Sequence, residues 1–147
     1  MARMRNLLRP GMPYRRRATA ATELCITLPL LVTLAVGGVD LGRAIYTSIA
    51  LSNAARTGVE YAATHKFTSF TRPFCETQVR QAVIDEMQPI SGFDPQRLTV
   101  IITTQSESSG LFIATVEAHY PFETIVNWVA VPHSVDLKRA VTMRQIR

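Results

Sequence analysis

The chain has 147 residues, two cysteines and a formal net charge of +5 at pH 7. Residues 1–17 contain six arginines and no acidic residue, so the remaining residues carry a net charge of −1. The basic character therefore belongs to the N-terminal tail. Without an accompanying aromatic or folded basic surface, it argues against a nucleic-acid-binding protein.

The first predicted elements are a leader and a membrane-spanning helix. Residues 1–18 are expected to form a basic cytoplasmic leader, and an uncharged apolar run of 16 residues extends from Leu24 to Val39. Such a run makes about 24 Å of helix, whereas the hydrocarbon core of a bilayer is about 30 Å thick. A span over residues 19–40 is long enough, and it draws Glu23 toward the hydrocarbon.

The arginines set the expected orientation, because basic residues that flank a span stay in the cytoplasm. We expect a single-pass membrane protein with a cytoplasmic N-terminus and an exported C-terminal domain. The membrane separates Cys25 from Cys75, so no intrachain disulfide is expected. Cys75 is then either a buried apolar residue or a reactive thiol.

Glu23 is the residue of the span that most needs an explanation. An acidic side chain at the centre of a membrane helix costs roughly 2.5–3.5 kcal/mol, so a retained carboxylate is expected to have a function. The alternative is a residue at a helix N-terminus that the helix dipole favours and that reaches the headgroups. Further along the span, Pro29 is expected to kink the helix or remove a hydrogen bond.

Beyond the span, the helix is predicted to continue as an amphipathic helix over residues 41–64. Apolar or small residues recur every three or four positions, and this stripe is expected to pack against the rest of the domain. The stripe consists of Leu41, Ile45, Ile49, Ser52, Ala55, Val59 and Ala62. Polar residues are expected to lie elsewhere on the helix, namely Asp40, Arg43, Thr47, Arg56 and Glu60.

Residues 65–147 are predicted to form an exported domain. A loop over residues 65–73 leads to a helix over residues 74–87, which Pro89 and the pair Ser91-Gly92 end. Three strands are expected over residues 98–105, 111–120 and 135–146. A turn at residues 106–110 joins the first two strands, and a connector over residues 122–133 precedes the third.

The second strand alternates between two faces. Phe112, Ala114, Val116, Ala118 and Tyr120 are expected to point inward, and Thr115, Glu117 and His119 outward, with Pro121 ending the strand. Arg139 interrupts the apolar face of the third strand, formed by Val135, Leu137, Val141 and Met143. The expected fold class is α+β, with the long N-terminal helix packed on a small antiparallel sheet.

No catalytic or cofactor motif is recognisable. His65, His119 and His133 lack metal-ligand spacing, and nucleophile-elbow, phosphate-loop and CxxC motifs are missing. We therefore expect a protein that is not an enzyme and that has no cofactor, metal or small-molecule substrate. An anchored enzyme using Cys75 with His119 is an alternative without a supporting motif. Another is a soluble exported protein cleaved near residues 35–37, and a third is a membrane-anchored binding domain.

Several segments carry a family resemblance. Residues 15–24 read RRRATAATEL, residues 28–31 LPLL, residues 39–44 VDLGRA and residues 51–62 LSNAARTGVEYA. Near the C-terminus, YPF at 120–122 and AVTMR at 140–144 extend the similarity. Together these segments resemble the TadE-like family, small pilin-like proteins of tight-adherence (Tad/Flp) pilus systems. The resemblance covers nearly the whole chain, and residues 15–62 are its specific part.

The resemblance implies a pilin-like fold and a minor pseudopilin that assists pilus assembly. It also implies that a prepilin peptidase cuts between Ala18 and Thr19, with alanine where the family usually has glycine. Glu23 would then be the fifth residue of the mature chain. Its carboxylate would pair with the new amine of a neighbouring subunit, because unpaired charges are costly in a dry helix bundle.

The resemblance implies a protein of the bacterial inner membrane with a periplasmic or extracellular C-terminal domain. The partners that it implies are the inner membrane, the prepilin peptidase, other pilin-like subunits and the assembly platform of the pilus. Small residues allow helices to approach closely, and the expected helix-packing positions are Gly42, Ala55, Gly58 and Ala62. The alternative for these small residues is that the helix packs on the chain's own sheet.

Overall fold

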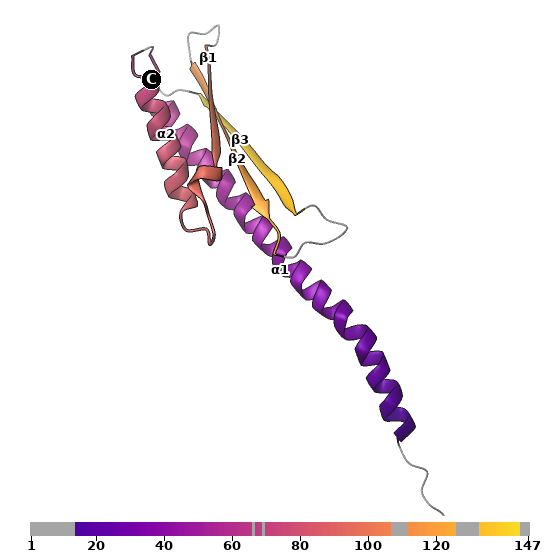
Figure 1. Ribbon diagram of the computed structural model, residues 1–147. Helices are drawn as coiled ribbons and strands as arrows, with labels where there is room; N and C mark the ends of the chain where they lie inside the picture. Colours follow the sequence, from indigo (N-terminus) through magenta and orange to yellow (C-terminus); the bar gives the residue numbers. More distant parts are fainter. Residues whose placement is uncertain (1–13, 66, 69, 107–111, 126–132, 145–147) are drawn as a thin grey trace, which may run out of the picture. The chain divides into compact units, whose positions relative to one another are not determined.

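The computed structural model of the chain describes residues 14–65, 67–68, 70–106, 112–125 and 133–144 (Figure 1). Most of the predicted turn at 106–110 and most of the connector at 122–133 lie outside the described residues. Contacts between Cα atoms divide the chain into two units, residues 1–38 and residues 39–147.

The first unit contains the N-terminal part of helix α1 (Tyr14–Thr64). Side chains from Thr19 to Ala35 are exposed, and the large apolar ones between Leu24 and Leu34 are 52% to 72% exposed. The helix continues through Pro29, so the proline does not end it. Within the described part of the chain, α1 is the one helix long and apolar enough to cross a membrane. It fits a single-pass membrane anchor.

The second unit is built on a three-stranded antiparallel sheet with the order β1-β2-β3. Its strands are β1 (Thr99–Ser106), β2 (Phe112–Glu123) and β3 (Ser134–Arg144). The central strand β2 pairs Val116 with Ile102 of β1 and with Val141 of β3. A short 3-10 helix, η1 (Pro95–Arg97), precedes β1. The predicted α+β arrangement of a long helix and a small antiparallel sheet is confirmed.

Two helices supply the other half of the core: α2 (Arg72–Met87) and the part of α1 that belongs to the second unit. The side chains of β2 that the alternation assigned inward, from Ala114 to Tyr120, are buried. They join buried residues of both helices in one cluster, which includes Leu51, Ala55, Val59, Val79, Val83 and Met87. The core therefore forms between one sheet face and two helices.

The predicted apolar stripe of α1 is correct in its C-terminal half and wrong before residue 50. Leu41, Ile45 and Ile49 are 53% to 62% exposed, whereas Asp40 and Thr47 are buried. The reason is that hydrogen bonds satisfy both polar side chains where they are buried, so the helix can turn its polar positions inward. The apolar side chains of this stretch are left on the outside.

Two details of the strands differ from expectation, whereas the position of Arg139 on the inner face agrees with it. β2 continues through Pro121 to Glu123. The pairing of β1 with β2 ends at Thr99–His119, so beyond His119 the strand β2 pairs with β3 on one side only. A proline that lacks an N–H is acceptable at such a local edge. Phe112, expected to be buried, is 47% exposed at the start of β2. Arg139 donates a hydrogen bond to Ser48 Oγ of α1, which accommodates its charge on the inner face.

Candidate functional site

Ala18, Thr19 and Glu23 lie within α1, in the first unit. The side chains of Thr19 and Glu23 are exposed, and the hydroxyl of Thr27 donates a hydrogen bond to the backbone carbonyl of Glu23. The predicted roles of these three residues involve a peptidase and a neighbouring subunit. They therefore stay predictions.

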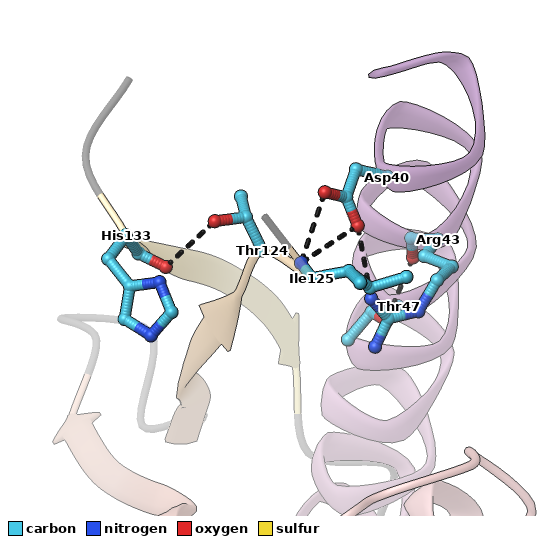
Figure 2. Close-up of polar contacts among 6 residues, drawn as sticks. All are labelled: Asp40, Arg43, Thr47, Thr124, Ile125 and His133. Atoms are coloured by element: carbon cyan, nitrogen blue, oxygen red, sulfur yellow. Dashed lines mark hydrogen bonds and ion pairs between the residues drawn. The ribbon is translucent and has the colours of Figure 1, made fainter. Parts of the chain in front are cut away.

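The second unit begins with a polar cluster around Asp40. The backbone N–H of Ile125 donates to both carboxylate oxygens of Asp40 at 3.1 Å, and Arg43 Nη1 lies 3.2 Å from Oδ1 (Figure 2). One turn further on, the hydroxyl of Thr47 donates to the carbonyl of Arg43 at 2.9 Å. Beside Ile125, Thr124 closes the base of the β2–β3 connection by donating its N–H to the carbonyl of His133 at 3.1 Å.

This cluster fastens the chain after β2 to the start of the helix in the second unit. The Asp40 side chain is only 8% exposed, so its charge needs the arginine and the backbone N–H that surround it. Sequence reasoning missed this role because Asp40 was expected on the outer side of the helix. The available signal was its spacing, since positions 40, 47 and 51 share one helix face and Leu51 is fully buried.

An exposed apolar stripe, defined here as Leu41, Ile45 and Ile49, runs along the opposite side of the same segment. The three side chains follow one another at intervals of four residues and so lie one above the next. Tyr46, at 60% exposure, adds an aromatic ring close to this surface. Three large aliphatic side chains therefore remain exposed on one side of a helix that buries a carboxylate on the other.

The small residues proposed for helix packing separate into two groups. Ala55, Gly58 and Ala62 are buried in the domain's own core. A Cβ atom built on Gly58 would lie 2.7 Å from Val83 Cγ2, so this glycine lets α1 and α2 approach closely. Gly42 is exposed, and a Cβ there would meet nothing within 4 Å.

The described residues do not place Cys75 beside His119. Cys75 is buried on α2, which packs against the inner face of the sheet. His119 lies on the outward face of β2, as the alternation predicted, and its Nε2 lies 2.7 Å from the carboxylate of Glu117. Within the described residues, no cluster of three or more histidine, cysteine or acidic side chains could hold a metal ion.

Comparison with known proteins gives one result. Residues 18–60 match the model of the TadE-like protein family. Neither curated proteins nor solved structures gave a match. The matched segment contains Ala18, Thr19 and Glu23, the apolar run and the exposed apolar stripe. It also contains the buried α1 residues Leu51, Ala55 and Val59. Proteins of this family are associated with tight-adherence pili and are generally structural rather than catalytic. Over residues 18–60 the chain is therefore similar to the TadE-like family, as the resemblance implied.

Proposed function

We propose that the protein is a non-catalytic, pilin-like subunit that assists assembly of a tight-adherence pilus or a related secretion machine. Residues 19–40 anchor it in the inner membrane, with the leader in the cytoplasm and the domain of residues 65–147 outside. The leader is removed by a prepilin peptidase between Ala18 and Thr19. The family match over residues 18–60 supports the class of machine.

The observation that carries the proposal is the exposed apolar stripe of Leu41, Ile45 and Ile49. The hydrocarbon tails of the lipids can cover the apolar run up to Val39, but these three side chains come after it and belong to the folded second unit. Exposing them to water is unfavourable by roughly 25 cal/mol per Å² of apolar surface. A helix of another pilin-like subunit, with its own apolar face, covers such a stripe and connects the anchor to an assembly.

Glu23 sets the axial register of the contact between the helices of neighbouring subunits. After cleavage, Thr19 carries an α-amine four residues before the carboxylate. Two opposite charges in a dry helix bundle are stable only as a pair. The amine of one subunit and the Glu23 carboxylate of the next form that pair, which fixes how far neighbouring helices are displaced along their axes.

The test replaces Ile45 by glutamine and compares it with Ile101→Gln. The two isoleucines are 53% and 45% exposed, and Ile101 lies on β1, away from the stripe. Both variants are expressed in bacteria that lack the native protein, and membrane levels, surface pili and adherence are measured. We expect normal levels of both proteins and a loss of pili with Ile45→Gln alone.

Equal piliation by the two variants would contradict the proposed docking surface. If Glu23→Ala also left piliation normal, the alternative of a membrane-anchored binding domain outside the pilus would be favoured. If Ile45→Gln lowered the protein level, a melting curve of the purified variant would separate misfolding from failed assembly.

A further inference from the structure

The second unit contains a cleft that the proposed function does not use. It has a volume of about 180 Å³, and its lining includes Arg43, Tyr46, Ser91, Arg97 and Glu123. This volume is more than ten times the roughly 15 Å³ that one water molecule needs. The cleft therefore has room for a polar group of several heavy atoms. We propose that it binds the phosphoethanolamine headgroup of a membrane phospholipid.

The lining offers donors for a phosphate. Arg43 directs Nη1 to Asp40 at 3.2 Å, and Arg97 directs Nη2 to Glu123 at 2.7 Å. A guanidinium carries five N–H donors in a planar fork, so both arginines keep donors for phosphate oxygens. The Arg43 guanidinium is held over the ring of Phe122, 5.3 Å from its centroid, which orients it at the cleft.

The charge of the lining selects a zwitterion over an anion. Arg43 and Arg97 are each matched by a carboxylate, Asp40 and Glu123, so these four groups are neutral together. Asp40 is buried and occupied by Arg43 and Ile125, whereas the Glu123 side chain is 51% exposed at the cleft. A phosphate between the arginines therefore leaves Glu123 to accept hydrogen bonds from an ammonium group. Phosphoethanolamine carries both charges a short distance apart.

The position of Arg43 along the sequence of the helix matches the headgroup layer. Arg43 lies four residues after Val39, the last residue of the apolar run, which is about 6 Å along a helix. The headgroup layer on each side of the hydrocarbon core is roughly 5–8 Å deep. Tyr46, which also lines the cleft, is 60% exposed, and such aromatic side chains concentrate at this level of a membrane.

The experiment uses the full-length protein, purified from an equimolar mixture of phosphatidylethanolamine, phosphatidylglycerol and phosphatidylcholine, with the co-purifying lipids quantified by mass spectrometry. Arg97→Gln is the test variant, because its ion pair with Glu123 is exposed and contributes little to stability. Arg56→Gln is the matched control, since Arg56 forms a similar exposed pair with Glu60 outside the cleft. We expect about a tenfold loss of retained phosphatidylethanolamine with Arg97→Gln and no change with the control.

A second variant tests the ammonium contact. Glu123→Gln should remove the preference for phosphatidylethanolamine over phosphatidylcholine while leaving phosphate-dependent retention in place. Retention of phosphatidylglycerol equal to that of phosphatidylethanolamine by the native protein would overturn the proposal, as would an Arg97→Gln variant that retains lipid normally.

Soluble competitors distinguish a lipid from a free ligand. Glycerophosphoethanolamine or inorganic phosphate, added at the concentration of the lipid, should not displace phosphatidylethanolamine, because neither has acyl chains in the membrane. Displacement by either would show a soluble ligand instead and overturn the lipid assignment. The inference rests on the membrane anchor of the proposed function but not on pilus assembly. Lipid retention by the purified protein can fail while piliation is normal, and piliation can fail while lipid retention is normal.

Discussion

Two acidic residues of α1 have different requirements for a partner. Asp40 is buried, and the chain itself supplies Arg43 and the N–H of Ile125 to its carboxylate. Glu23 stands before an apolar run whose side chains are exposed, where dehydration of a charge is costly. The proposed partner of Glu23 comes from another chain. Loss of the Glu23 carboxylate should therefore affect assembly without affecting the fold.

The corresponding prediction concerns Glu23→Ala. Removing a costly charge from the membrane leaves insertion and folding unchanged or improved. Assembly fails, because the α-amine that cleavage creates on a neighbouring subunit loses its proposed counter-charge in a dry bundle. Glu23→Asp keeps the charge and shortens its reach, so it causes partial loss. Membrane levels by immunoblot, compared with counts of surface pili, measure the two effects separately.

Normal piliation with Glu23→Ala would show that the carboxylate is only a favourable residue at a helix end. The control is Glu60→Ala. Glu60 is an exposed acidic residue of the same helix that pairs with Arg56 and lies in the second unit. Its loss should leave both membrane level and piliation unchanged.

At the scale of elements, close packing of α1 and α2 depends on the missing side chain at position 58. The nearest atoms to a Cβ there are Val83 Cγ2 at 2.7 Å and methyl carbons of Val79 and Val116 at 3.4 Å. These atoms belong to α2 and to the central strand, so one glycine adjusts the spacing of three elements.

Replacing Gly58 and Gly42 by alanine should change stability in opposite directions. Gly42→Ala meets nothing within 4 Å and should stabilise the helix by about 0.5–1 kcal/mol. Gly58→Ala gains the same helical preference but forces its Cβ against Val83. Overpacking costs about 1–3 kcal/mol, so the variant should be less stable than the native protein. Thermal unfolding of the full-length protein in detergent measures both, and a stabilised Gly58→Ala would contradict the close approach.

The predictable parts of the fold are those set by neighbouring residues. The alternation from Ala114 to Tyr120 depends only on the two-residue period of a strand, and the structure confirms it. The burial of Asp40 depends on Ile125, 85 residues further along the chain, and no local pattern contains that contact. An amphipathic pattern assumes that polar side chains face water, and it fails where a distant backbone group satisfies a carboxylate. The exposed apolar stripe was missed for the same reason.

At the scale of the whole molecule, the two units have different requirements. The second unit buries its own core between two helices and a sheet. From Thr19 to Gly38, the first unit exposes nearly all of its apolar side chains, and this segment needs a bilayer or neighbouring helices around it. If the proposed function holds, the protein is inserted first and assembled later, and removal of the leader is the step that separates the two stages.

The last prediction concerns that step. The protein extracted from membranes should begin at Thr19, with the N-terminal sequence Thr-Ala-Ala-Thr-Glu. Ala18→Leu should leave a full-length, membrane-bound precursor, because the resemblance implies that the peptidase accepts a small residue before the cut. Ala20→Leu makes the same change on the mature side and should be processed normally. Intact mass and N-terminal sequencing decide the outcome. An intact Met1 in the native protein would reject processing, and a start near Gly38 would instead support the soluble exported protein.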